Sequence, residues 1–131
     1  MALTEAIRRF IATGPVAHVV TLDADGGPQV SLAWVGIESD EIVIGTLHDQ
    51  VKLRNLRRDP RIAVSFQAPG RNAYELDNYL VLRGTARVTE GGAAHLLHDL
   101  AQIYIGPGTR FPPMPDPPPG FVTRVTIAKV A

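Results

Sequence analysis

The densest cluster of chemically active side chains in the sequence is a run of cations. Five Lys and Arg residues fall within residues 52–61, which read KLRNLRRDPR. Apolar side chains at helical spacing place this run on a helix that Asp59-Pro60 ends. Unpaired N–H groups of a helix's first turn attract anions. A hydroxyl, an amide, a backbone N–H and an ammonium group are available there, from Thr46, Gln50, Val51 and Lys52. The pattern predicts a phosphate site; the alternative is a solvated basic helix face.

Other polar residues are weaker candidates for chemistry. His95 and His98 have the spacing of metal ligands on a helix, with Asp99 beside them, but no third ligand is apparent. We therefore expect exposed polar groups and no metal site. His18 shares a strand face with apolar neighbours and is interpreted as a hydrogen-bonded core histidine. Ser31 lacks the G-x-S-x-G context of a hydrolase nucleophile, and the chain has no cysteine, which excludes thiol catalysis.

One tryptophan and one proline-rich stretch complete the candidates. Trp34 is interpreted either as packing in a dimer interface or as stacking beside a cofactor or substrate. Residues 106–120, called here the proline segment, hold seven of the eleven prolines. We expect a stiff connector, in which Arg110, Phe111 and Met114 line a substrate pocket.

The elements that must position these residues are mostly strands. Alternating apolar residues are cleanest over residues 78–89, where Leu80, Leu82 and Ala86 share one face. Helical spacing predicts helices with Asp49 and Thr89 as the caps of the second and third. The expected helices are 3–13, a second that carries Val51, Leu53 and Leu56 and ends at Asp59-Pro60, and 93–104. The expected strands are 16–22, 29–37, 42–46, 62–66, 78–89 and 121–130.

Length and composition indicate one globular domain, residues 1–131. The chain is 45% hydrophobic and 20% charged, with thirteen basic and thirteen acidic residues. Zero net charge argues against general nucleic-acid binding. No apolar run approaches the roughly 20 residues of a membrane span, and the first residues lack the apolar core of a signal peptide. We expect a cytoplasmic protein without nucleic-acid or membrane partners.

Six short strands with only brief helices between them do not suit a parallel sheet, in which each crossover needs its own helix. The sequence therefore predicts a mainly β fold, an antiparallel barrel with peripheral helices. The apolar strands around residues 30–35 and 80–88 offer more apolar surface than a monomer of this size leaves exposed, which favours a homodimer.

Four segments carry a resemblance to a known family: residues 28–34 (PQVSLAW), 42–46 (IVIGT), 52–61 and 82–86 (LRGTA). In order and spacing they resemble the pyridoxamine 5′-phosphate oxidase-like family of flavin proteins. More narrowly, the K-x-R-N-L-x-x-D-P-R run is similar to that of the small actinobacterial branch that uses the deazaflavin coenzyme F420. The resemblance implies a six-stranded antiparallel split β-barrel of the FMN-binding type. It also implies a homodimer with two cofactors at its interface.

The resemblance also implies roles for individual residues. The cofactor phosphate would lie at Thr46, Gln50, Val51 and Lys52, and the ring would lie along Val30, Ser31, Leu32 and Ala33, with Trp34 one pleat further on. Arg54 and Arg57 would attract the anionic tail of F420. Many relatives carry Arg or Ser two residues before the lysine, where this chain has Gln50.

The resulting functional hypothesis is an F420-dependent oxidoreductase that moves a hydride between the deazaflavin and a small, planar, conjugated substrate. Hydride chemistry in a chain with no cysteine and no evident triad needs a borrowed cofactor. An FMN-dependent oxidase or reductase is the alternative within the same class. A dimer that binds a cofactor or haem without catalysis is the alternative from another class.

Overall fold

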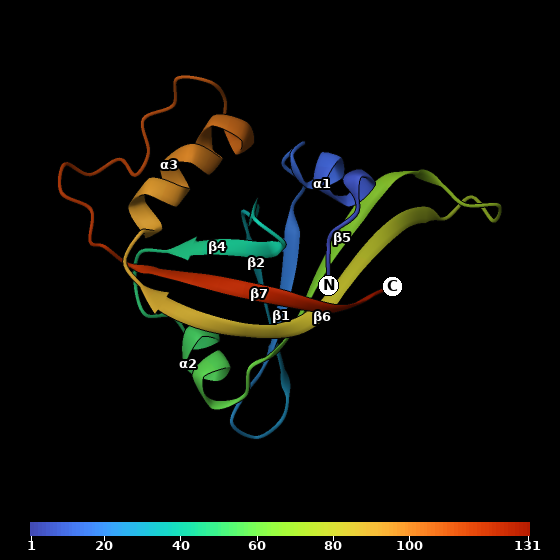
Figure 1. Cartoon of the computed structure of the whole chain (residues 1–131), viewed down its shortest axis with the longest axis horizontal. Coiled ribbons are helices and arrows are strands. Elements are labelled where there is room, and N and C mark those ends of the chain that lie inside the picture. The colour runs from blue at the N-terminus through green and yellow to red at the C-terminus, as the bar shows by residue number, and fades with distance from the viewer.

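The computed structural model describes residues 1–131. Three helices and seven strands follow one another along the chain (Figure 1). Their bounds are α1 Glu5–Ile11, β1 Ala17–Leu22, β2 Pro28–Ala33, β3 Gly36–Glu38, β4 Glu41–Thr46, α2 Val51–Arg58, β5 Arg61–Arg71, β6 Asp77–Glu90, α3 Ala93–Tyr104 and β7 Phe121–Val130. None of the helices has the length and apolar character that a membrane span requires.

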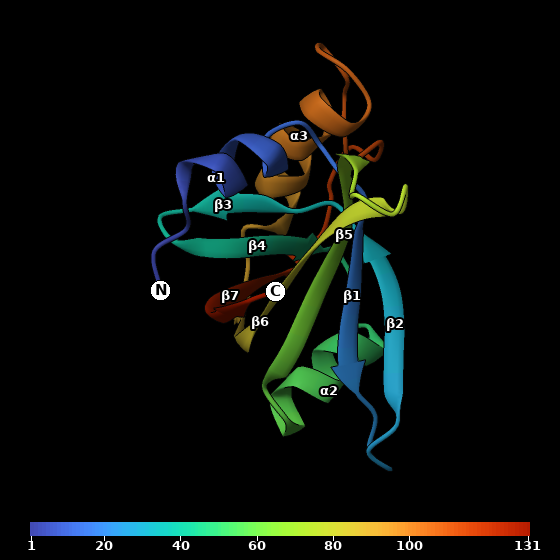
Figure 2. The same cartoon turned by 90° about the vertical axis from the view of Figure 1, so that its right-hand side faces the viewer.

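All seven strands form one antiparallel sheet in the order β2-β1-β5-β6-β7-β4-β3. The long strands β5 and β6 lie at its centre and join two halves. In Figure 2 β1 and β2 stand upright beside β5, whereas β3, β4 and β7 run across them. The strongly bent sheet is a mainly β split barrel, so the predicted fold class is confirmed.

One expected strand, residues 29–37, is wrong, and the structure has seven strands rather than six. The chain leaves β2 at Ala33 and enters β3 at Gly36. β2 pairs with β1, whereas β3 pairs with β4 in the other half of the sheet. An alternating pattern carries no information about which strand is the partner, so a change of partner within it is invisible in the sequence.

The expected helix caps were also wrong. Gln50 precedes α2 without a side-chain cap bond, and Asp49 instead forms an ion pair with Arg57. Gly92 in the left-handed conformation precedes α3, while Thr89 donates its hydroxyl hydrogen to the Val122 carbonyl. Because β6 stays paired with β7 as far as Glu90, Thr89 is still part of the sheet.

The core lies between the sheet halves. It includes Val19, Ile44, Phe66, Leu82 and Val125, each at most 1% exposed. A smaller cluster under α3 consists of Val43, Leu96, Leu100 and Val122. The alternation predicted for 78–89 is confirmed.

His18 is exposed, which contradicts its interpretation as a core histidine. Ala17, Val19 and Thr21 are the buried residues of β1. Both faces of this strand are rich in apolar residues, so hydrophobicity alone could not decide which face points inward.

β6 and β7 approach each other closely at Gly84. Consecutive residues Arg83 and Gly84 pair with Lys129 and Ile127, so Ala128 is the extra residue of a β-bulge. A Cβ atom at Gly84 would overlap the Thr126 carbonyl oxygen and lie 2.9 Å from its carbon. Only glycine fits here, because the obstacle is backbone.

We predict that Gly84→Ala lowers the free energy of unfolding by about 3 kcal/mol, the cost of overpacking against rigid backbone. Urea denaturation followed by circular dichroism measures the change. The control is Thr85→Ala, an exposed position on the same strand, which should change stability by no more than about 0.5 kcal/mol. Equal losses in the two variants would contradict the packing argument.

Candidate functional site

A cavity of about 510 Å³ opens where the two halves of the barrel meet. Its walls come from the end of β2, the end of β4, the loop that leads into α2, and one side of α3. Phe111 of the proline segment closes part of it. This volume lies within the range of small-molecule and cofactor sites.

One end of the cavity is polar and holds a buried amine. Thr46, His48, Gln50 and Lys52 line it. Lys52 is only 6% exposed, and burial lowers the pKa of its ammonium group, with no charged neighbour to counter the effect. Removing a cation from water without a partner is unfavourable, so this end of the cavity is electrostatically incomplete.

The hydroxyl group of Thr46 is also unpaired. Its Oγ1 atom is buried and has no hydrogen-bond partner. Buried polar groups in proteins are nearly always hydrogen-bonded, so an exception calls for an explanation. An anion with several oxygen atoms, such as a phosphate, would accept hydrogen bonds from the hydroxyl and the ammonium group together. The donors present therefore fit the phosphate of a flavin or deazaflavin.

The other end of the cavity is aromatic. Trp34 stacks on Tyr104 with ring centroids 5.4 Å apart and planes 15° apart. Phe111 packs against Trp34 at 5.2 Å with its ring tilted by 55°. Leu32 and Leu97 continue this apolar wall.

Tyr104 ties the aromatic end to the barrel. Its hydroxyl accepts a hydrogen bond from the Val35 N–H at 3.1 Å and donates one to the Pro15 carbonyl at 2.7 Å. Burial raises the pKa of this phenol, which favours the protonated form that can donate. One side chain therefore joins α3 to the chain before β1 and to the junction between β2 and β3.

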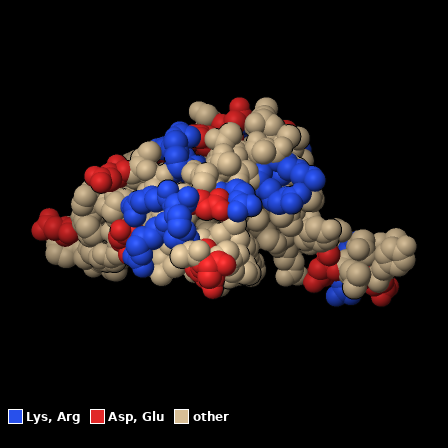
Figure 3. All heavy atoms as spheres, turned by 90° about the horizontal axis from the view of Figure 1, so that it is seen from below, with Lys and Arg blue, Asp and Glu red and all other residues tan.

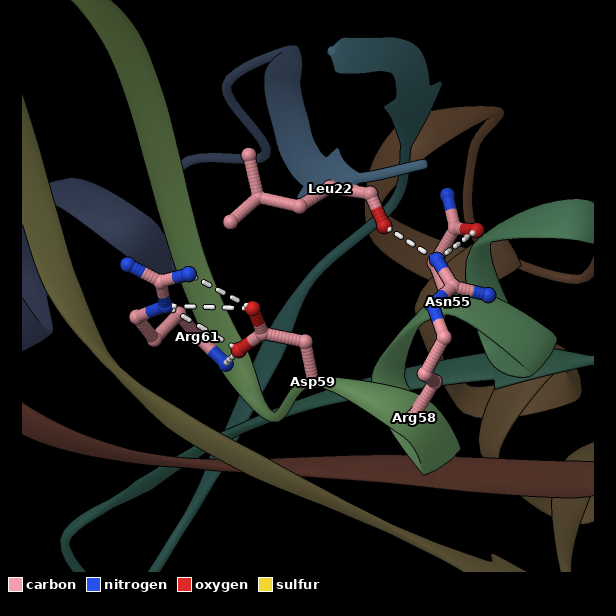
Figure 4. Close-up of polar contacts among 5 residues, drawn as sticks. All are labelled: Leu22, Asn55, Arg58, Asp59 and Arg61. Atoms are coloured by element: carbon pink, nitrogen blue, oxygen red, sulfur yellow. Dashed lines mark hydrogen bonds and ion pairs between the residues drawn. The ribbon is translucent and has the colours of Figure 1, made fainter. Parts of the chain in front are cut away.

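Helix α2 is held in place by the residues that follow Lys52 (Figure 4). Asn55 is buried and donates through Nδ2 to Thr21 Oγ1 and to Asp23 Oδ1, both at 3.0 Å. Arg58 donates to the Leu22 carbonyl at 2.7 Å and to Asn55 Oδ1 at 3.0 Å. These bonds fix the helix against the end of β1 and so fix the direction of Lys52, one turn earlier on the same face.

The exit from α2 carries a local ion pair. Arg61 forms several hydrogen bonds to the Asp59 carboxylate, which hold the pKa of Asp59 at about 2. Both side chains are directed at each other, as Figure 4 shows, so neither serves the cavity.

The structure brings six of the residues predicted from the sequence to the cavity: Leu32, Ala33, Trp34, Thr46, Gln50 and Lys52. The other five do not line it: Val30, Ser31, Val51, Arg54 and Arg57. Val30 and Val51 are exposed. Ser31 has a buried, unpaired Oγ atom on the opposite face of β2 from Leu32. Whether each of these residues binds a cofactor stays a prediction.

Arg54 and Arg57 lie beside the polar end rather than in it. Arg54 donates to the Asp49 carbonyl at 3.3 Å, and Arg57 pairs with the Asp49 carboxylate at 2.9 Å while its guanidinium lies over Phe121. Figure 3 shows the face of the molecule seen from below, on which basic patches alternate with acidic atoms.

His48 and Tyr104 line the cavity but were not singled out in the sequence. The signal that could have found His48 is its position between the end of a strand and the start of the basic helix. Tyr104 is the last residue of the helix expected over 93–104, and its position there carries no signal of a site. The two other histidines lie outside the cavity: His95 is 3.4 Å from Asp99, and His98 contacts the Phe111 carbonyl.

Comparison with known proteins decides the family. The model of the pyridoxamine 5′-phosphate oxidase family matches residues 3–131, almost the whole chain. The chain belongs to the pyridoxamine 5′-phosphate oxidase family. Among curated proteins, none matches it in sequence.

Solved structures agree with this family's split barrel. An F420 reductase is 23% identical with a TM-score of 0.78, and the match covers 98% of each chain. A conserved hypothetical protein from Mycobacterium tuberculosis is 25% identical with a TM-score of 0.76, covering 99% of this chain and 84% of that one. HupZ of Group A Streptococcus is 20% identical with a TM-score of 0.66, covering 98% and 91%. At such identities these likenesses establish the shared fold.

The largely buried Lys52 ammonium group should destabilise this member of the pyridoxamine 5′-phosphate oxidase family when no ligand is bound. We expect Lys52→Met to stabilise the cofactor-free protein by about 1 kcal/mol at pH 7, because it removes an unpaired buried cation. Burial depresses the folded-state pKa below 10.5, so the unfolded chain binds the proton more tightly. The gain in the free energy of unfolding over the unmodified protein should therefore be largest below the folded-state pKa of Lys52. It should disappear as the pH rises toward 10.5.

Urea denaturation at several pH values measures this difference. Lys129→Met is the matched control, because Lys129 is the only other lysine and is exposed. A loss of stability in Lys52→Met, or the same gain in both variants, would contradict the argument.

Proposed function

We propose that this protein is a cytoplasmic F420-dependent oxidoreductase that moves a hydride between the deazaflavin and a small, planar, conjugated substrate. The observation that carries the proposal is the buried, unpaired Thr46 hydroxyl next to the largely buried Lys52, in a cavity that aromatic side chains also line. The membership of the pyridoxamine 5′-phosphate oxidase family and the similarity to an F420 reductase support it.

The residues of this chain would hold the cofactor at its phosphate. The Thr46 hydroxyl and the Lys52 ammonium group donate to the phosphate oxygens, and the first turn of α2 adds unpaired backbone N–H groups. The β2 residues Val30 to Ala33 and Trp34 would border the ring. The bound deazaflavin supplies a carbon that accepts or releases a hydride.

The protein's contribution is position and exclusion of water. Asn55 and Arg58 fix α2, so the Lys52 ammonium group keeps its direction without rearrangement on binding. A preorganised donor loses little entropy when the ligand arrives. Trp34, Tyr104 and Phe111 limit the access of water at the opposite end, where a second, uncharged ligand would lie.

We favour F420 over FMN because of the positive charge beside the polar end of the cavity. F420 continues beyond its phosphate into an anionic tail, whereas FMN ends there. Arg57 pairs with the Asp49 carboxylate, whereas Arg54 donates to the Asp49 backbone carbonyl. Two guanidinium groups thus stand beside one carboxylate, which leaves a net positive charge beside the start of α2. These arginines are partly exposed, so their attraction for a tail is screened by salt.

Titration of the purified protein with F420 and with FMN, followed by ligand fluorescence, tests the cofactor. We expect F420 to bind more tightly at about 0.05 M salt and the gap to narrow at about 0.5 M, because the Debye length falls from about 14 Å to about 4 Å. Tighter binding of FMN would favour the FMN-dependent alternative. Binding of either cofactor without turnover of any conjugated acceptor would favour a cofactor carrier.

In the same titration, Lys52→Met should weaken cofactor binding by about 10- to 150-fold, the loss of a charge-assisted bond of roughly 1.5 to 3 kcal/mol. Thr46→Val should cost less, about 0.5 to 1.5 kcal/mol, because it removes a neutral donor. Lys129→Met again serves as control. Unchanged affinity in Lys52→Met would remove the phosphate site.

We also propose a homodimer. Apolar side chains are exposed on β2 and just before β1: Val30 is 58% exposed, Leu32, at the cavity, 64%, and Val16, also at the cavity, 55%. The hairpin between β5 and β6 extends away from the body of the molecule, with Tyr74 84% and Leu76 63% exposed (Figure 1). Apolar surface of this extent supports contact with a second copy of the chain.

Sedimentation velocity over a range of concentrations tests the assembly. We expect a dimer with two-fold symmetry that buries more than roughly 2,000 Å², as obligate dimers do. Val30→Lys should shift the protein toward monomer, because it places a charge within the apolar face. A monomer at every concentration would contradict the proposal.

A further inference from the structure

The proline segment lies against α3, and its own backbone has little to hold it. In Figure 1 it leaves the end of α3, arches beside that helix and returns to the start of β7. Six prolines between residues 112 and 119 remove backbone donors from this part of the chain. The only hydrogen bonds within the segment form one turn, from Thr109 back to Gly106. Its position must therefore be set by residues outside it.

Helix α3 supplies those contacts through one glutamine. Gln102 Nε2 donates to the Thr109 carbonyl at 2.8 Å, and Gln102 Oε1 accepts from the Gly108 N–H at 2.8 Å. The same Nε2 group also donates to the His98 carbonyl at 3.0 Å, which ties the side chain to its own helix. The N–H and the C=O groups of the Gln102 side-chain amide are thus both hydrogen-bonded to the backbone of the proline segment.

A second contact acts two residues further on. His98 Nδ1 lies 3.1 Å from the Phe111 carbonyl oxygen, a hydrogen bond when the proton is on Nδ1. Together Gln102 and His98 fix residues 108–111 along one side of α3. At its other end the segment is held by the Gly91 and Ala93 N–H groups, which donate to the Gly120 and Pro119 carbonyls.

These contacts fix where the Phe111 ring lies. The ring packs on Trp34 at 5.2 Å and lines the cavity at its aromatic end. The other aromatic residues there belong to β2–β3 and α3 and are anchored by the Tyr104 hydroxyl. Tyr104 ends α3 and Trp34 lies in the two-residue break between β2 and β3, whereas Phe111 is carried by the long proline segment between α3 and β7.

We propose that Phe111 is the residue that determines the size of the uncharged ligand accepted at the aromatic end, and that Gln102 is the positioning residue that keeps it there. The inference rests on the proposed function in one respect: it assumes that the substrate binds at the aromatic end of the cavity. Removing the Phe111 ring lengthens the space available to a ligand at the aromatic end of the cavity. Loss of the Gln102 contacts releases the proline segment, so the ring can move out of that space. Both changes therefore allow a longer ligand to bind.

The first test uses Trp34, the only tryptophan, as reporter. Phe111→Ala and Gln102→Met should both shift Trp34 emission and increase its quenching by acrylamide. Gln102→Met keeps the length of the side chain and removes only its polar atoms, so α3 retains its packing. His95→Ala is the matched control, because the His95 side chain is 86% exposed on the same helix. No spectral change in Gln102→Met would overturn its positioning role.

The second test measures size selection. Benzyl alcohol, 2-naphthalenemethanol and 9-anthracenemethanol are titrated into the protein, with Trp34 fluorescence as readout. The unmodified protein should favour the shorter alcohols. In Phe111→Ala and in Gln102→Met the affinity of the anthracene relative to benzyl alcohol should rise about tenfold, the range that small changes in an apolar pocket produce. His95→Ala should keep the original order.

The outcomes separate this inference from the proposed function. An unchanged order in Phe111→Ala overturns the size limit, and a changed order in Phe111→Ala but not in Gln102→Met overturns the positioning role. Each series is run without cofactor and again with F420. Failure of F420 to bind counts against the proposed function, while the cofactor-free series still tests Phe111. Competition between F420 and every alcohol would overturn the assignment of this end to a second ligand.

Discussion

A buried ammonium group without a partner is the constraint around which this protein is organised. Lys52, at the start of α2, is only 6% exposed, and burial lowers the pKa of its ammonium group. Such a group destabilises the protein unless other interactions compensate. The bonds of Asn55 and Arg58 to the end of β1 supply the rigidity that keeps it in place. This arrangement is the physical basis of the proposed phosphate site.

The sheet determines which segments reach this amine. β5 and β6 join two half-sheets. β2 belongs to one half and β4 to the other, and both strands end at the same cavity. The bulge opposite Gly84 lets β7 stay close to β6. Local bending of the central strands thus brings Thr46 of one half near Leu32 of the other.

Helix α3 links the two ends of the cavity. It packs on β4 at Gly45, where a Cβ atom would meet Leu97 at 3.2 Å. From the same helix Tyr104 holds the junction of β2 and β3, and Gln102 holds the proline segment. A single rigid element therefore positions an aromatic wall made from three separate parts of the chain.

The sequence alone determined the mainly β class, the long alternating strand and the basic helix, because these depend on local periodicity and composition. The proximity of Thr46, Gln50 and Lys52 followed from the same local order. Tertiary structure decided the rest. The strand break at Trp34-Val35 and the exposure of His18 depend on which strands pair, and the pattern of one strand does not encode this. Helix packing and the path of the proline segment bring Tyr104 and Phe111 to one cavity. Arg57 and Arg58 are basic in the sequence, but only the fold shows their partners. Arg57 pairs with the Asp49 carboxylate, and Arg58 donates to the Leu22 carbonyl, which is distant along the chain.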